Sequence, residues 1–292
     1  MADLAEYLQS PFVWRAALGL LFIAINAALA GAFAAFRSAT FLISGAAHAA
    51  LAGAALVLVA GGALAQSDIS PVLGGAVFAI GLALLAAAAR DTQGQRETDV
   101  TIGVGFAFSM ALAVLLISLI PDKAARVWGI LLGDLLLLTA GDLWVLGLTT
   151  ALIVLCFAVF WRPFIFVTFD MEGAQAFGLR AAPYNYLLFA LIGLSTAVLL
   201  KSVGAIVVFA MLAAPAATAR LLAHSVRRTM VYAFLIALLA GVVALLLSSV
   251  VRFSVSGLAA LLASGSYFVG RGYVWLTERQ VAHSSHQGGV SA

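Results

Sequence analysis

One histidine, His48, lies in the middle of a long apolar stretch, one helical turn after the serine at position 44. Residues four apart face the same side of a helix, so Ser44 and His48 are placed to share a cation, a water molecule or a hydrogen bond. A neutral imidazole is a good ligand for zinc and other borderline cations, whereas a serine hydroxyl is a poor one. The pair therefore predicts a histidine-led contact for a divalent cation.

Two other interpretations of His48 stay open on the residues alone. Hydrocarbon offers no water to a ring nitrogen, so a carbonyl or serine on a neighbouring helix would satisfy His48 in a purely packing role. A serine–histidine dyad would make the chain an intramembrane enzyme. Catalytic dyads usually join different helices, however, and neighbours one turn apart seldom have in-line geometry. Position alone leaves the cation contact and packing equally open and disfavours the dyad.

The apolar stretch also predicts how deep His48 lies. Arg37 precedes it by about 16 Å if the intervening residues form one helix. With Arg37 at the inner surface of a hydrocarbon core ~30 Å thick, the imidazole would lie near the bilayer centre.

The segments that hold these residues have the composition of membrane-spanning helices. Of the 292 residues, 64% are hydrophobic and 9% are charged, and the mean hydropathy is +1.15. A soluble domain carries roughly 25% charged residues, so a water-soluble fold is excluded. Runs of about 20 apolar residues recur from end to end, long enough to cross the hydrocarbon core. None of them alternates as the strands of a membrane barrel do.

We therefore predict an all-α integral membrane protein, a polytopic bundle of eight or nine transmembrane helices in the lipid bilayer. The candidate spans are 12–35, 40–64, 71–90, 100–120, 143–163, 184–200, 203–222, 229–250 and 254–275. Residues 1–277 form one membrane domain, and residues 278–292 form a polar, disordered cytoplasmic tail. A glycine-interrupted stretch from Val127 to Leu138 is expected to be a re-entrant or interfacial helix.

The charges predict the orientation of the chain. The net charge of +3 fits lysine and arginine concentrated in cytoplasmic loops better than it fits a nucleic-acid partner. If all nine segments span the membrane, their distribution over the loops places the N-terminus outside and the C-terminus inside the cell. The single cysteine, Cys156, excludes a disulfide within the chain.

Two absences narrow the possible functions. The sequence has no Gly-x-x-x-x-Gly-Lys-Ser/Thr loop, so the chain does not itself cradle nucleotide phosphates, and no tightly bound cofactor is expected. No acidic residue falls near the centre of an apolar segment, where a proton- or sodium-coupled carrier usually places one. An ion- or proton-coupled secondary carrier is the alternative that these absences weaken.

Two polar loops between spans have features of their own. Asp170 precedes a possible helical turn and Gly178 follows it, which predicts a short capped helix at the membrane surface. Pro215 lies inside an apolar segment and is expected to break or end its helix. The basic residues that follow are either ordinary positive-inside residues or a docking surface for a partner protein; they are Arg220, Arg227 and Arg228.

Several motifs follow one another along the chain. They are Gly31-x-Phe33 with Arg37, His48-Ala-x-Leu-x-Gly53, Asp99-Val-Thr-Ile-Gly103, Trp128 to Asp142 with Gly133, Phe169-Asp170 with Gly178, and Val203-Gly204 through Pro215 to Arg220. Their order and spacing resemble those of the permease subunits of ABC transporters that take up zinc, manganese or iron. The resemblance covers roughly residues 20 to 270.

The resemblance implies a type II ABC importer permease in the cell membrane, a homodimer around a central pathway that hydrolyses no ATP itself. A separate ATPase would use ATP, and an extracytoplasmic binding protein would deliver the metal. His48, helped by Ser44, would contact the metal along its path. The ATPase coupling surface would comprise Asp170, Pro215, Arg220, Arg227 and Arg228.

The chain departs from the family at one position. The family usually has aspartate four residues before the histidine, and this chain has Ser44 there. An aspartate compensates the charge of a dehydrated cation far better than a serine does, and hard, oxygen-seeking manganese loses most from the change. Zinc is therefore the first expectation for the metal, and manganese or iron the next.

Overall fold

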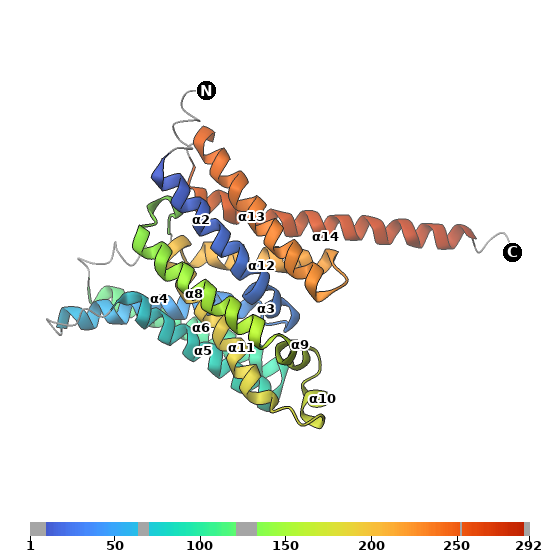
Figure 1. Ribbon diagram of the computed structural model, residues 1–292, viewed down its shortest axis with the longest axis horizontal. Helices are drawn as coiled ribbons and strands as arrows, with labels where there is room; N and C mark the ends of the chain where they lie inside the picture. The colour runs from blue at the N-terminus through green and yellow to red at the C-terminus, as the bar shows by residue number, and fades with distance from the viewer. Residues whose placement is uncertain (1–9, 64–69, 121–132, 252, 289–292) are drawn as a thin grey trace.

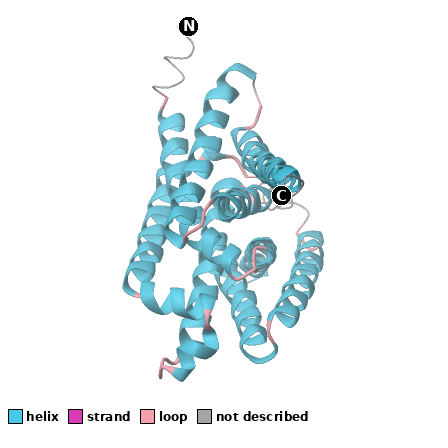
Figure 2. Ribbon diagram, turned by 90° about the vertical axis from the view of Figure 1, so that its right-hand side faces the viewer, coloured by secondary structure: helices cyan, strands magenta, loops and turns pink. Residues whose placement is uncertain are grey.

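The computed structural model describes residues 10–63, 70–120, 133–251 and 253–288, and every regular element in these ranges is helical (Figures 1 and 2). The long helices are α2 (Pro11–Asn26), α4 (Phe41–Ala63), α5 (Pro71–Gln93), α6 (Gln95–Ser118), α8 (Ala140–Val159), α11 (Ala181–Val203), α12 (Ala205–Leu222), α13 (Val226–Val251) and α14 (Val255–Gly288). The short elements are η1 (Ala27–Gly31), α3 (Ala32–Phe36), η3 (Leu135–Leu137), α9 (Trp161–Phe169) and α10 (Met171–Ala176). The predicted all-α class is confirmed.

The described residues contain eight helices that are long and apolar enough to cross a membrane. They coincide with the first eight predicted spans, and the first of them runs from Pro11 to Phe36 through the π-helical turn η1. The chain is thus a multi-pass membrane protein. The ninth predicted span, 254–275, lies in α14, which is not among the eight.

The structure differs from the predictions for two segments, the C-terminal tail and the stretch from Val127 to Leu138. Helix α14 extends to Gly288, into the stretch predicted to be a disordered tail. No proline after Val255 interrupts the helix. The predicted re-entrant helix from Val127 begins outside the described residues. Its last part is the 3₁₀ turn η3, which Asp134 caps by accepting a hydrogen bond from the Leu136 N–H at 3.0 Å.

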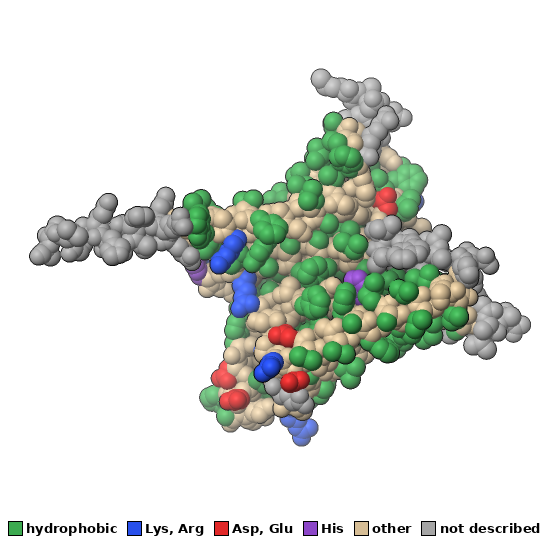
Figure 3. All heavy atoms as spheres, turned by 180° about the vertical axis from the view of Figure 1, so that it is seen from behind, with side chains coloured by type: hydrophobic (Ala, Val, Ile, Leu, Met, Phe, Trp, Pro, Cys, Tyr) green, Lys and Arg blue, Asp and Glu red, His purple; other side chains and the backbone are tan. Residues whose placement is uncertain are grey.

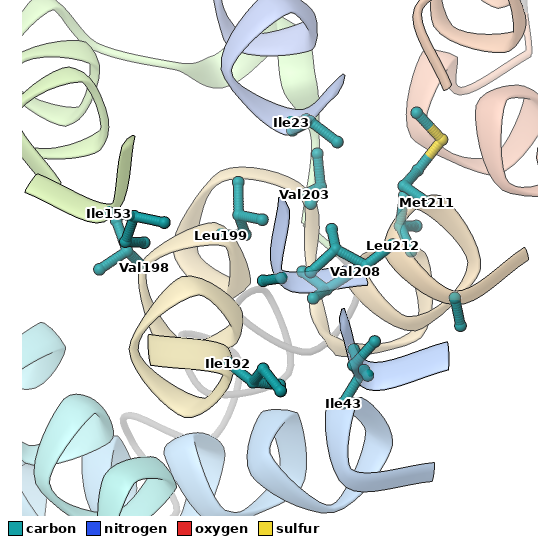
Figure 4. Close-up of a cluster of buried hydrophobic side chains, with 14 of the residues drawn as sticks. Ile23, Ile43, Ile153, Ile192, Val198, Leu199, Val203, Val208, Met211 and Leu212 are labelled. Atoms are coloured by element: carbon teal, nitrogen blue, oxygen red, sulfur yellow. The ribbon is translucent and has the colours of Figure 1, made fainter. Parts of the chain in front are cut away.

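The core of the bundle is built around α11 and α12. Figure 4 shows side chains of these two helices together with Ile23 of α2, Ile43 of α4 and Ile153 of α8, all of them buried. Gly204 joins α11 to α12 with a φ of 85°, and a Cβ on Gly133 would lie 2.2 Å from the Gly204 nitrogen. Glycine at both positions allows the segment before η3 to pass against this junction.

Pro215 does not end its helix. Helix α12 runs from Ala205 to Leu222 with Pro215 buried inside it, which corrects the prediction of a break. Proline is tolerated inside a membrane helix when neighbouring helices enclose the backbone groups that it frees. The alanines on both sides of Pro215 leave room for its ring.

A buried polar cluster joins three spans inside the bundle. The side chain of Asn26, the last residue of α2, donates to the Thr150 hydroxyl of α8 at 2.9 Å and accepts from the Ser195 hydroxyl of α11 at 2.7 Å. All three residues are at most 3% exposed. Interhelical hydrogen bonds of this kind hold membrane helices together where the hydrophobic effect does not.

Close packing of α4 on α5 gives a test of the fold. A Cβ on Gly53 would lie 2.2 Å from the backbone oxygen of Gly74, so Gly53→Ala forces the two helices apart. Such overpacking costs about 1–3 kcal/mol, and we expect a lower thermal unfolding temperature in detergent. Gly81→Ala, where nothing lies within 4 Å of the new Cβ, is the matched control on α5.

Because alanine is the better helix former by about 1 kcal/mol, Gly81→Ala should leave the unfolding temperature unchanged or raise it. Equal shifts for the two variants would show that α4 and α5 are not packed as closely as the structure has them.

Candidate translocation site

His48 lies closer to one end of its helix than the sequence predicts. Helix α3 ends at Phe36, Ser38 adopts a left-handed conformation (φ 55°), and α4 begins at Phe41. The hydrogen bond from the Ala39 N–H to the Ala34 oxygen, at 2.8 Å, closes this turn. His48 is therefore about 10 Å along α4. The expected 16 Å of continuous helix from Arg37 to His48 is wrong, and a position near the bilayer centre stays a prediction.

The His48 ring has a defined orientation. Its Nδ1 lies 2.8 Å from the backbone oxygen of Ser44, and since a carbonyl only accepts, Nδ1 carries the proton. The ring meets Phe106 of α6 edge to face, with centroids 4.6 Å apart at 71°. In a neutral imidazole this arrangement leaves Nε2 with a free lone pair, the form that ligates a metal.

Ser44 and His48 contact one another, but through the Ser44 carbonyl rather than the hydroxyl. Ser44 is buried, with 9% of its surface exposed, and His48 is half-buried. The structure thus confirms that both residues lie on one face of α4.

One chain does not form a complete metal site within the described residues. Those residues hold no group of three or more His, Cys, Asp or Glu side chains placed to share a metal ion. Zinc takes four ligands as a rule, and manganese and calcium-like cations take more. A cation at His48 therefore needs donors from water, the protein backbone or another chain.

Charged side chains concentrate at one end of the molecule. Figure 3 shows most of those on its face gathered there, beside a broad hydrophobic area. The turn between α3 and α4 lies at this end, and it receives side-chain hydrogen bonds from three other helices. Arg90 of α5 donates to the Arg37 oxygen at 3.1 Å, Gln95 of α6 donates to the Ser38 oxygen at 3.1 Å, and Arg220 of α12 donates to the Ala35 oxygen.

The short helix α10 has the predicted cap. Asp170 accepts a hydrogen bond from the Gly173 N–H at 2.8 Å, and Gly178 follows the helix with a φ of 81°. Asp170 is exposed, and Phe177 just beyond α10 is 84% exposed. Sequence reasoning did not single out Phe177, although an aromatic residue next to a predicted surface helix was a usable signal.

The structure separates the other residues of the predicted coupling surface. Arg227 and Arg228 are exposed at the start of α13. Arg220 is also exposed, and its guanidinium donates a hydrogen bond to the Ala35 oxygen near the end of α3. Pro215 is buried and contributes no surface of its own. Nothing in the described contacts joins these residues to Asp170 directly.

Two polar groups of the bundle were missed in the sequence. Arg37 was counted as a loop charge, yet it is only 2% exposed. Lys201, near the C-terminal end of α11, forms an ion pair with Asp142, near the N-terminal end of α8, with 2.5 Å between Nζ and Oδ1. This pair lies at the end of the two helices away from the turn between α3 and α4. Asp142 also caps α8, through a reciprocal pair of hydrogen bonds with Thr139.

The apolar spans and the charged end define a polytopic membrane protein with a half-buried imidazole on one of its helices. The model of the ABC 3 transport family matches residues 9–273, and the chain belongs to this family. The manganese import system permease protein ScaB of Streptococcus parasanguinis is 30% identical over 95% of this chain and 96% of its own length. The high-affinity zinc uptake system membrane protein ZnuB of Haemophilus influenzae is 28% identical over 47% of this chain and 52% of its own.

A solved structure has the same fold. PsaBC from Streptococcus pneumoniae, in complex with Fab, superposes with a TM-score of 0.78 at 25% identity, covering 92% of this chain and 94% of the matched chain. The predicted resemblance to metal-uptake ABC permeases is confirmed.

Proposed function

We propose that this chain is the permease subunit of an ATP-driven importer of a divalent metal cation. Three observations support this proposal: the chain belongs to the ABC 3 transport family, its relatives are named as metal permeases, and its sequence has no phosphate-binding loop. The observation that carries the proposal is the His48 ring, whose Nδ1 bond to the Ser44 oxygen leaves Nε2 free on a half-buried face. ATP hydrolysis belongs to a separate ATPase, so the chain is not itself an enzyme.

We propose zinc as the first cargo and manganese or iron(II) as the next. A relative that matches 95% of this chain is named for manganese, and another relative is named for zinc. At the site itself the donor is an imidazole with a serine one turn away, which suits zinc better than it suits a hard cation. We therefore rank zinc before manganese and iron(II) because of the ligand chemistry of Ser44 and His48.

A second copy of the chain would complete the site. A single His48 gives one nitrogen ligand, and the described residues supply no further cluster of metal donors. A two-fold dimer, the commonest oligomer, brings two His48 side chains to one axis if their faces meet. The cation would then move through a transient site with two imidazoles and water.

The orientation and partners follow from the charged end. Positive residues favour the cytoplasm, so the end with Arg37, Arg90 and Arg227 would face inward and the N-terminus would lie outside. The C-terminus would then lie inside only if α14 crosses the bilayer as a ninth span, in addition to the eight candidate spans. The exposed Phe177 beside α10 and the exposed Arg220, Arg227 and Arg228 would contact the ATPase. An extracytoplasmic binding protein would deliver the metal to the opposite end.

Reconstitution tests the proposal. The permease is to be purified with its ATP-binding subunit, placed in proteoliposomes, and supplied with the binding protein loaded with zinc, manganese or iron(II) in turn. We expect metal accumulation only when the ATPase, ATP and the binding protein are all present. Accumulation driven by a proton or sodium gradient without the ATPase would instead establish the secondary-carrier alternative.

A further inference from the structure

Arg37 is buried and forms hydrogen bonds with two other helices. We call the following residues the Arg37 cluster: Arg37, its partner Asn185, Thr168 beside its partner Val167, and the half-buried Gln95, which contacts the next residue, Ser38. The Arg37 guanidinium donates through Nη1 to the Val167 oxygen of α9 at 2.6 Å and through Nη2 to the Asn185 side-chain oxygen of α11. Its Cζ lies over the Phe189 ring, 5.5 Å from the centroid. Asn185 in turn donates to the Ala87 oxygen of α5 at 3.0 Å.

The charge of Arg37 is held by dipoles rather than by a carboxylate. Among the described residues the one ion pair joins Lys201 to Asp142, at the end of α11 opposite Asn185 and Arg37. Val167 lies in the last turn of α9, where carbonyls lack helical partners and carry partial negative charge. Burial lowers the pKa of Arg37 to about 10, with the nearby Arg90 a smaller cause, so the side chain stays protonated at neutral pH.

The Arg37 cluster holds unused hydrogen-bonding capacity. Within the described residues the buried side-chain atoms that lack a partner are Arg37 Nε, Thr168 Oγ1 and Gln95 Oε1. Thr168 follows Val167 in the chain, and Gln95 donates to the oxygen of Ser38, the residue after Arg37. Buried polar groups are nearly always paired, so these three atoms have the capacity to take a partner in a second arrangement of the helices.

The cluster lies between the proposed docking helix and the helix with His48. Helix α9 ends at Phe169 and passes through Asp170 directly into α10. On the other side, the turn after Arg37 leads within four residues into α4. A movement of α9 relative to this turn would therefore act on both the proposed ATPase contact and the proposed translocation site.

We propose that Arg37 is a positioning residue that couples movement of α9 and α10 to movement of α4. The proposal rests on the proposed function, since it assigns ATP-driven movement to α10. When α9 shifts, the guanidinium exchanges its bond with the Val167 oxygen for one with the Thr168 hydroxyl, and its Nε gains a partner. The buried charge stays solvated by protein dipoles in both arrangements.

Thr168→Val separates coupling from a merely structural role. Valine has the shape of threonine without the hydroxyl, and the Thr168 hydroxyl has no partner in this arrangement. A structural role therefore predicts unchanged or raised thermal stability and unchanged transport. Coupling through Thr168 instead predicts that the metal accumulated per ATP hydrolysed falls about tenfold while ATP hydrolysis itself stays within about twofold.

Arg37→Lys is the second variant. Lysine keeps the positive charge, but its single ammonium group does not reproduce the two guanidinium nitrogens that donate to α9 and to α11 at the same time. We expect the same loss of metal accumulated per ATP hydrolysed. Arg96→Lys, at an exposed arginine next to Gln95, is the matched control and should transport like the wild type.

The readout is zinc and manganese accumulation and phosphate release in the same proteoliposomes, with thermal unfolding of each variant in detergent. A wild-type complex that accumulates no metal with ATP would overturn the proposed function. A wild-type complex that transports, with folded Thr168→Val and Arg37→Lys variants that keep the wild-type ratio, would overturn the coupling role alone.

Discussion

Replacing His48 with alanine is expected to reduce ATP-driven metal accumulation at least tenfold, for every metal that the wild type transports. Even the partners that orient a metal ligand cost about 10–100-fold in affinity when they are removed, and His48 would be a direct ligand. The variant also loses the edge-to-face contact with Phe106, a packing term of about 1 kcal/mol. That packing loss is too small to unfold the bundle, so the transport defect should appear in a folded protein.

His224→Ala is the matched control, because His224 is exposed between α12 and α13. Zinc, manganese and iron(II) uptake are to be measured separately with equal amounts of purified complex. His224→Ala should transport like the wild type, and both variants should keep basal ATP hydrolysis. If His48→Ala retains full uptake of every metal, the histidine serves packing against Phe106 and the Ser44 carbonyl.

The spans and the cap of α10 were predictable because their signals are local. Hydropathy over about 20 residues identifies a span wherever it lies in the fold. An acidic residue before a turn and a glycine after it, as at Asp170 and Gly178, likewise carry their meaning in the sequence. These predictions needed no knowledge of neighbouring helices.

The errors arose where tertiary contacts decide the outcome. Ser38 takes a left-handed conformation that usually calls for glycine, so nothing in the sequence marked the turn that shortens the distance to His48. Pro215 continues its helix because its neighbours enclose it. Arg37 is buried because carbonyl and amide groups on α9 and α11 receive its donors, and those helices are more than a hundred residues away in sequence.

Ser44→Asp is expected to shift the preference of the transporter from zinc toward manganese, by about tenfold in the ratio of the two uptake rates. The substitution places a carboxylate on the face of α4 that carries His48, one turn away. A hard cation gains most from a charged oxygen ligand, because the carboxylate compensates for the water that the cation loses. Ser44 is 9% exposed, so this charge would also be largely removed from water.

That burial supplies a second readout. An unpaired buried carboxylate is destabilising, so the metal-free Ser44→Asp variant should unfold at a lower temperature than the wild type, and manganese should restore part of the loss. Ser44→Asn is the matched control, since it adds an oxygen of similar size without the charge. If Ser44→Asn shifts the preference as much as Ser44→Asp, an added oxygen ligand and not its charge selects the metal. If neither variant moves the ratio, the residue at position 44 does not face the path of the cation, and His48 acts without a partner on its own helix.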